Sequence, residues 1–283
     1  MENNTTYHTI TQKITTILKT GIVPWAQSWT GPAPRNFATG KPYRGVNALL
    51  LRAAARTSPF WLTKHQLEEH GCQPIKGQRP SLATFWRKNE GEEKSSLLFY
   101  PLWALDQLQN APACPPLPAT AVRSFEAADV LIKAMPAKPN TTRTGDAAYY
   151  DPATDLVNIP RTQKFSDLNH YYSTWFHELI HSTRHASRLN RIYRQQAEAP
   201  LNCGQCDFSR EELVAELGAA LLCAETGIVH HCITQAAGWL QALEADEKLL
   251  VHAAAAAQRA ADFLTGQVAV PAQSTTNAGV TTP

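Results

Sequence analysis

The stretch His177-Glu178-Leu179-Ile180-His181 has the pattern H-E-x-x-H and lies within residues 166–185, a run of helical character. Residues four apart lie on one face of an α-helix, so His177 and His181 can bind the same metal ion. Glu178 is the next residue around the helix and can reach a water molecule on that ion. Two imidazoles, an open coordination position and a carboxylate that accepts a proton are the components of zinc-dependent hydrolysis. The pattern therefore predicts a metal site with Glu178 as the catalytic base.

A site of this kind needs a third protein ligand, and a second helical run over residues 210–222 contains two candidates. Glu212 and Glu216 are four residues apart and share one face of that helix. We expect one of them to complete a His-His-Glu site and the other to orient a ligating histidine through its free ring N–H. Glu212 is favoured as the ligand, and the reverse assignment stays open. Glu211 is interpreted as a solvated acid in the first helical turn, stabilised by the helix dipole.

Length and composition bound the class of protein. The chain has 283 residues and is 43% hydrophobic, which suffices for two domains with a core. No apolar run approaches the roughly 18–20 residues of a membrane span, and residues 1–16 lack an apolar signal core. Six cysteines are scattered along a chain too large to need disulfides. These features predict a cytoplasmic protein that has reduced thiols and no membrane partner.

Charge is divided unevenly along the chain. Residues 1–105 contain 13 Lys and Arg against 6 Asp and Glu, whereas residues 106–283 contain 13 against 18. Five of the seven tryptophans also fall in the first 105 residues. A basic, aromatic half joined to an acidic half suggests two different tasks.

Composition and periodicity divide the chain into four segments of an α+β protein. Residues 1–106 are expected to form a small α+β domain that binds single-stranded DNA, and residues 107–122 a Pro-rich linker. Residues 123–265 are expected to form a mostly helical domain with a short β-hairpin, and residues 266–283 a disordered tail. The predicted helices cover residues 7–20, 46–56, 64–70, 125–135 and 234–265, and the predicted strands residues 82–87, 97–103, 147–150 and 156–160. Residues 195–209 are interpreted as a loop.

Cationic, aromatic and amide side chains gather in the Pro/Gly-rich turns of the first domain. Cations neutralise phosphates, and unpaired bases stack on aromatic faces with about 1–3 kcal/mol each. The candidate DNA-binding residues are Trp25, Trp29, Arg35, Asn36, Lys41, Tyr43, Arg44, Asn47, Trp61, Lys76 and Arg79. For Trp25, Trp29 and Tyr43 a role in the core is an open alternative. The arginines of residues 184–194 are interpreted as a solvated face, or as an extension of the nucleic-acid path.

Longer motifs carry a resemblance to a known family. The first half contains Gly21-Ile22-Val23-Pro24-Trp25, Pro34-Arg35-Asn36, Gly40-Lys41-Pro42-Tyr43-Arg44-Gly45-Val46-Asn47, Trp61-Leu62-Thr63 and Lys76-Gly77. The second half contains Tyr171-Tyr172, His177-Glu178-Leu179-Ile180-His181-Ser182-Thr183 and Glu211-Glu212-Leu213-Val214-Ala215-Glu216-Leu217-Gly218-Ala219-Ala220. Over about residues 7–265 the chain resembles the ArdC-like antirestriction proteins of conjugative plasmids. The resemblance implies a single-stranded-DNA-binding domain, a zincin-like metallopeptidase domain, and protection of transferred DNA from host restriction.

Two functional hypotheses follow. In the first, the chain is a peptidase that uses zinc or another divalent transition metal on a protein substrate, for which a host restriction component is a candidate. In the second, it coats single-stranded DNA or binds a protein without catalysis, and its metal site is structural or vestigial. Tyr149, Tyr150 and His170 are candidates to stabilise the reaction's oxyanion. The lone pair Cys203 and Cys206 lacks the second pair that a further zinc site needs.

Overall fold

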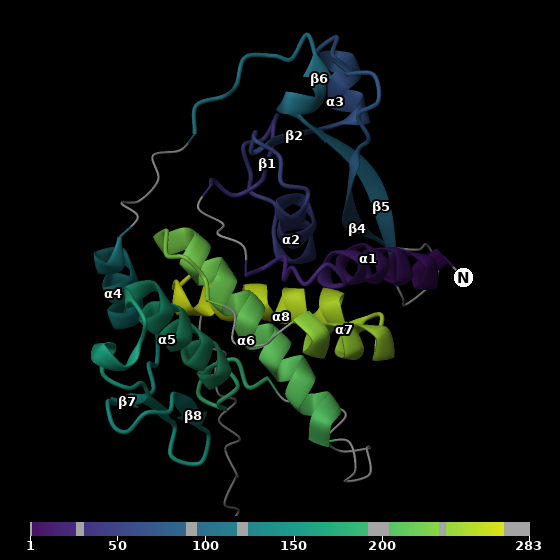
Figure 1. Ribbon diagram of the computed structural model, residues 1–283. Helices are drawn as coiled ribbons and strands as arrows, with labels where there is room; N and C mark the ends of the chain where they lie inside the picture. Colours follow the sequence, from purple (N-terminus) through teal and green to yellow (C-terminus); the bar gives the residue numbers. More distant parts are fainter. Residues whose placement is uncertain are drawn as a thin grey trace, which may run out of the picture.

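The computed structural model describes residues 2–26, 31–88, 95–117, 124–191, 204–231 and 236–268. Trp29, Cys203 and most of the predicted tail, from residue 269 onward, lie outside these ranges, and the side chain of Cys206 is not described either. Eight α-helices and three small sheets are present in the described residues (Figure 1). The α+β class predicted from the sequence is confirmed.

A four-stranded sheet with the order β1-β2-β5-β4 organises the first half. Its strands are β1 (Arg35–Asn36), β2 (Phe60–Thr63), β4 (Ser81–Lys88) and β5 (Ser95–Ala104). The hairpin of β4 and β5 is the one that the alternating pattern predicts. A smaller pair joins β3 (Gln73–Pro74) to β6 (Leu108–Gln109), directly after the short helix η1 (Leu105–Gln107). The strand β6 thus lies inside the segment expected to be linker.

Three helices accompany this sheet, namely α1 (Glu2–Leu18), α2 (Gly45–Ala53) and α3 (Lys64–Glu69). The helix α3 begins at a capping box in which Thr63 accepts from the backbone of Gln66 and the Gln66 side chain accepts from Thr63. The apolar stripe of α1 is fully used, since Ile10 and Ile14 are at most 1% exposed. That stripe packs against α7 in the second half, so one continuous core joins the two halves of the chain.

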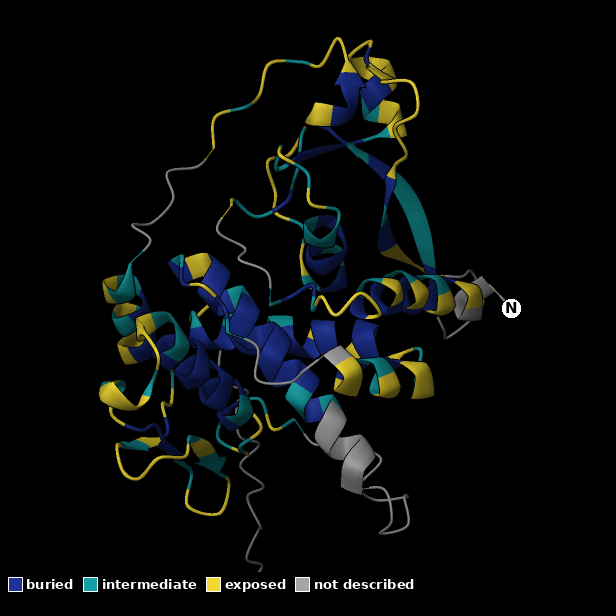
Figure 2. Ribbon diagram, viewed as in Figure 1, coloured by how far each residue is buried: buried dark blue, intermediate teal, exposed yellow. Residues whose placement is uncertain are grey.

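The second half is mostly helical. Its elements are α4 (Phe125–Ala134), β7 (Asn140–Thr142), β8 (Tyr149–Asp151), β9 (Leu156–Asn158), η2 (Thr162–Lys164), α5 (Leu168–Ser182), α6 (Gly204–Thr226), α7 (Ala236–Ala245) and α8 (Leu249–Leu264). The sheet has the order β7-β9-β8, and the predicted hairpin of β8 and β9 is confirmed. The helices α5, α6 and α8 pack together, and their buried residues form the largest dark block in Figure 2.

Two expectations for this half are wrong. The predicted helix over residues 234–265 is two helices, because the chain turns at Asp246, whose carboxylate accepts the N–H of Lys248. The predicted loop over residues 195–209 is helical from Gly204 onward. Local composition favoured a loop there. Among the described residues, no helix combines the length and the apolar character that crossing a bilayer requires.

The helices α5 and α6 approach closely at Gly218, which lies against Ile180. A Cβ added at Gly218 would lie 2.7 Å from Ile180 Cδ1 and 2.8 Å from its Cγ1. Ile180 is fully buried, and its β-branched side chain has few alternative rotamers in a helix. Glycine at this position therefore lets α6 bring its acidic residues up to α5.

We expect Gly218→Ala to lower the free energy of unfolding by about 1–3 kcal/mol, because it overpacks this contact. At an open helical site the same change would stabilise by roughly 1 kcal/mol. Urea denaturation measures the difference, and Gly218→Ala combined with Ile180→Val should recover part of the loss. A Gly218→Ala protein more stable than wild type would contradict the close approach.

Candidate metal centre

Three ligand atoms from α5 and α6 converge on one point. His177 Nε2 lies 3.0 Å from His181 Nε2, so the two imidazoles on the same helical face point at each other. Glu212 completes the group, with Oε2 3.3 Å from His177 Nε2 and Oε1 3.3 Å from His181 Nε2. These three residues are the group in the described part of the chain whose ligand atoms suit a metal ion.

The chemistry of this donor set fits a divalent transition ion. Two imidazole nitrogens and a carboxylate facing one another at these distances offer lone pairs that one cation can satisfy together. Although burial opposes ionisation of Glu212, hydrogen bonds with His177 and His181 lower the pKa of its carboxyl to about 2. The carboxylate is therefore ionised and available as a ligand at neutral pH.

Glu211, rather than Glu216, contacts His181 on the side of the ring away from Glu212. Its Oε1 lies 3.2 Å from His181 Nδ1, and Arg191 donates to both of its oxygens at 2.8 Å. Burial would raise the pKa of Glu211, but the hydrogen bond with His181 and the charge of Arg191 lower it to about 2. The interpretation of Glu211 as a solvated residue is wrong, since it is only 4% exposed. Its partner Arg191 lies outside α6 and distant from Glu211 in the sequence, so the helical pattern of α6 could not predict this contact.

Glu216 has a different neighbour. It is completely buried, and its Oε2 lies 3.4 Å from Nε2 of His230, whose Nδ1 lies 3.1 Å from the carbonyl oxygen of Trp25. Burial lowers the pKa of His230 to about 4, so this imidazole is neutral. Glu216, which we expected to orient a metal-binding histidine, instead contacts His230, and His230 contacts Trp25 of the first half of the chain.

We expect Glu211→Gln to weaken metal binding by about 10–100-fold, because the second partner of a ligating histidine fixes its ring and tautomer. Isothermal titration with Zn²⁺ or Mn²⁺ measures this directly. Glu68→Gln, an exposed acid on α3, serves as the control and should leave affinity unchanged. Unchanged affinity in Glu211→Gln would mean that Arg191 and Glu211 only stabilise the fold.

Glu178 lies in the same cleft as the three convergent residues. The cleft has a volume of about 760 Å³, and its wall includes Tyr149, Tyr150 and His170 as well as both histidines. Burial raises the pKa of Glu178, which moves the carboxylate toward the range of a base that works near neutrality. The backbone amide of Tyr150 in β8 partly offsets this rise in the pKa of Glu178.

The oxyanion candidates differ in their surroundings. The Tyr150 hydroxyl donates to Asp155 Oδ1 at 3.1 Å and accepts from Arg188, so it is already engaged. Tyr149 is 46% exposed at the rim of the cleft, and His170 stacks on His231 with ring centroids 5.1 Å apart. Of the two tyrosines, Tyr149 therefore has the more accessible hydroxyl for a substrate.

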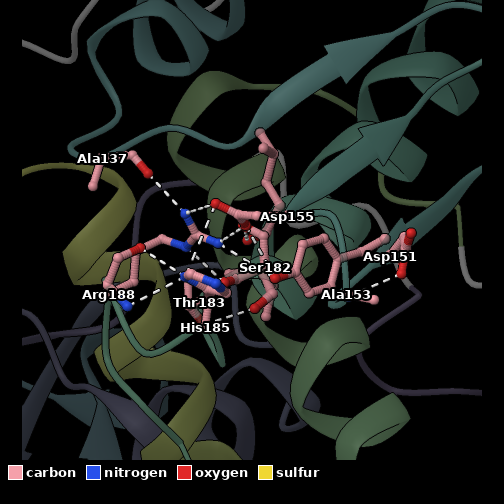
Figure 3. Close-up of polar contacts among 12 residues, drawn as sticks. Ala137, Asp151, Ala153, Asp155, Ser182, Thr183, His185 and Arg188 are labelled. Carbon is pink, nitrogen blue, oxygen red and sulfur yellow. Dashed lines mark hydrogen bonds and ion pairs between the residues drawn. The ribbon is translucent and has the colours of Figure 1, made fainter.

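Arg188 fixes the strand wall of the cleft to α5 (Figure 3). Its Nε donates to the carbonyl of Ser182 at 2.7 Å, and its Nη1 donates to the carbonyl of Ala137 at 2.8 Å and to Asp155 Oδ2 at 3.1 Å. Its Nη2 forms a second bond to Asp155, which makes the ion pair bidentate. Arg188 is 1% exposed, so its interpretation as part of a solvated or DNA-binding face is wrong.

Two expected DNA-binding tryptophans are buried. Trp25 is 0% exposed and lies edge-on against Trp239 at 6.0 Å between ring centroids, and Trp61 is 1% exposed in a cluster with Leu51. Neither ring offers a face to a base, which corrects the expectation for both. Apolar burial took precedence over the extended, Pro-rich context from which exposure was expected.

The side chain of Asn47 also has a structural role. Its side chain donates to the carbonyl of Thr84 and accepts from the Thr84 N–H, both at 2.8 Å, which pairs α2 with the edge strand β4. The other candidates within the described residues are partly or fully exposed: Arg35, Asn36, Lys41, Tyr43, Arg44, Lys76 and Arg79. Lys76 and Arg79 lie in the segment between β3 and β4. The strand β3 pairs with β6, which lies at the end of the first half away from α8 in Figure 1.

Both halves match described families. Residues 4–111 match the family "N-terminal domain of anti-restriction factor ArdC", and residues 126–256 match "Zincin-like metallopeptidase". The crystal structure of the antirestriction ArdC protein from R388 plasmid with Mn(II) bound is similar over 92% of this chain and 97% of that one, at 30% identity and a TM-score of 0.76. Its metal-free form gives 30% identity and a TM-score of 0.70.

Similar sequences occur in proteins of different length. A DNA primase TraC of Escherichia coli is 29% identical over 93% of this chain, which spans 20% of that protein. The uncharacterized protein y4eC of Sinorhizobium fredii is 28% identical over 92% of both chains. The chain thus spans about a fifth to a quarter of the primases that it matches.

Proposed function

Because this chain belongs to the ArdC-like antirestriction family, we propose that it protects incoming DNA from host restriction in the cytoplasm. In this proposal the first half binds single-stranded DNA and the second half is a metal-dependent peptidase. The observation that carries the proposal is the convergence of His177, His181 and Glu212 beside the buried Glu178. The resident metal would be zinc or another divalent transition ion, and the similar R388 protein is described with Mn(II).

The residues of this chain divide the chemistry among themselves. His177, His181 and Glu212 would hold the ion, which supplies the Lewis acidity that polarises a peptide carbonyl and activates water. The Glu178 carboxylate accepts the proton of the attacking water and returns it to the leaving amine. Glu211 and Arg191 hold the His181 ring, and Arg188 holds the strand wall against which an extended substrate lies.

A protein substrate suits the shape of this site. The strand β8 is an edge of its sheet and lines the cleft, so its backbone can pair with an extended chain. Components of host restriction are the candidate substrates, since their removal would directly protect transferred DNA.

The proposal is tested by conjugative transfer into a restricting and a non-restricting recipient. We expect the chain to raise transfer into the restricting recipient and to leave the other unchanged. Purified protein should also bind single strands more tightly than duplex, with affinity that falls steeply as salt rises. Equal transfer with and without the chain, or equal affinity for both forms of DNA, would count against the respective half of the proposal.

A further inference from the structure

A second cleft, with a volume of about 670 Å³, lies between the two halves of the chain. One wall comes from the segment of β1 and α2, and the other from α6 and α8. Figure 1 shows α2 standing over α8, and the two helices are in contact. The volume falls in the range of small-ligand pockets, which are frequent at domain interfaces.

The two walls have opposite polar character. The first wall presents the guanidinium groups of Arg35, Arg44 and Arg52. The second wall presents acidic and amide groups, namely Glu225, Gln258 and Asp262. A ligand with an anionic group at one end and hydrogen-bonding edges at the other therefore matches the cleft.

Apolar surface lies between these polar groups. The second wall includes Leu221, Ala224 and Ala261, and the first includes the ring of Tyr43. The Tyr43 hydroxyl accepts a hydrogen bond from Asn36 at 3.4 Å, which helps to hold the ring in place. A planar apolar group can pack against such a ring, as bases do on aromatic side chains.

In the described part of the chain, the guanidinium group of Arg35 has a buried N–H without an acceptor, which a bound ligand could supply. Its Nη1 donates to the carbonyl of Gly40 at 3.0 Å, but its Nε is buried and has no hydrogen-bond partner among the described residues. A buried guanidinium N–H without an acceptor is costly, and a phosphate oxygen would satisfy it.

We propose that this cleft binds one nucleotide of a DNA single strand, with the phosphate on Arg35 and Arg52 and the base between Tyr43 and the wall of α6 and α8. This inference rests on the single-strand binding proposed above and gives it a location. On the second wall Glu225 can accept hydrogen bonds from base donors, whereas Gln258 and Asp262 already bind each other. A base can stack on Tyr43 only when it has left a duplex, so binding in the cleft favours single strands.

An ion pair already spans the cleft. Arg44 binds Asp262, and the backbone N–H of Gly45 donates to Gln258 Oε1 at 3.0 Å. Asp262 therefore competes with a phosphate for Arg44 and repels the strand. Removing its charge should strengthen DNA binding, which is a result that misfolding cannot produce.

The test is fluorescence anisotropy with a labelled 15-nucleotide single strand and the full chain. Arg52→Gln and Arg35→Gln should each weaken binding about tenfold and reduce the salt slope of log affinity by about 0.7, the value for one lost phosphate contact. Asp262→Asn should tighten binding several-fold. Lys64→Gln removes an equal charge from the exposed start of α3, outside the cleft, and should change affinity less than about twofold.

The outcomes separate this inference from the proposed function. If the wild-type protein binds the strand but the Arg35 and Arg52 variants behave as Lys64→Gln does, the cleft is not the site. If Asp262→Asn weakens binding in a protein that melts as wild type does, the competition argument is overturned. If free dTMP competes as strongly as the oligonucleotide, the cleft binds a free nucleotide, and the proposal that it binds a nucleotide of a DNA strand is overturned. A wild-type protein that binds no single strand refutes the proposed function itself.

Discussion

A Glu178→Gln protein is expected to keep its metal and to hydrolyse peptide bonds about 10²–10⁴-fold more slowly than wild type. The amide has nearly the same shape as the carboxylate but cannot accept the proton of the attacking water. The three convergent groups His177, His181 and Glu212 are unchanged, so metal content should stay near one ion per chain. Cleavage of an unfolded protein substrate by the metal-saturated protein measures the rate, and elemental analysis measures the metal.

Matched variants make this result specific. Glu68→Gln removes an exposed carboxylate from α3 and should retain the wild-type rate, whereas His177→Ala should lose both metal and activity. The same proteins in the transfer assay separate the two functional hypotheses. If Glu178→Gln loses hydrolysis yet protects transferred DNA fully, protection comes from binding and not from proteolysis.

An Arg188→Met protein is expected to be less stable than wild type by about 3–5 kcal/mol, the usual cost of removing one partner from a buried ion pair. The change leaves Asp155 without its bidentate partner and leaves the carbonyls of Ala137 and Ser182 without their donor. Methionine has a similar length, so the loss reports the polar network and not a cavity. Urea denaturation followed by circular dichroism measures the free energy of unfolding.

Arg184 supplies the control for this prediction. It lies four residues before Arg188 but is exposed, so Arg184→Met should change stability by less than about 0.5 kcal/mol. Equal effects of the two substitutions would show that the network around Arg188 contributes little. Because Arg188 also holds the strand wall, its loss should reduce peptide hydrolysis even below the unfolding transition.

The helical spacing of His177 and His181 was sufficient to predict that both imidazoles point to the same place, since side chains four residues apart lie on one helical face. Alternation predicted the hairpins of β4 with β5 and of β8 with β9 for a similar reason. These patterns are local, and the residues that create them are neighbours in the chain.

The sequence could not decide which acid of α6 supports which histidine. Glu211 and Glu216 are both buried. The packing of α6 on α5 at Gly218 brings Glu211 to His181, and the chain that follows α6 brings His230 to Glu216. Composition likewise could not tell a stacking tryptophan from a core one, and Trp25 became core because the second half covers it.

What the sequence determined by itself is therefore the α+β class and the pair of imidazoles with a carboxylate beside them, because short-range helical and strand geometry dictates both. The tertiary structure alone decided that Arg188 binds Asp155, that Arg191 binds Glu211, and that a cleft separates arginines from acids between the two halves. These contacts join residues far apart in the chain, and an isolated charge looks the same in a sequence whether water or a buried partner surrounds it.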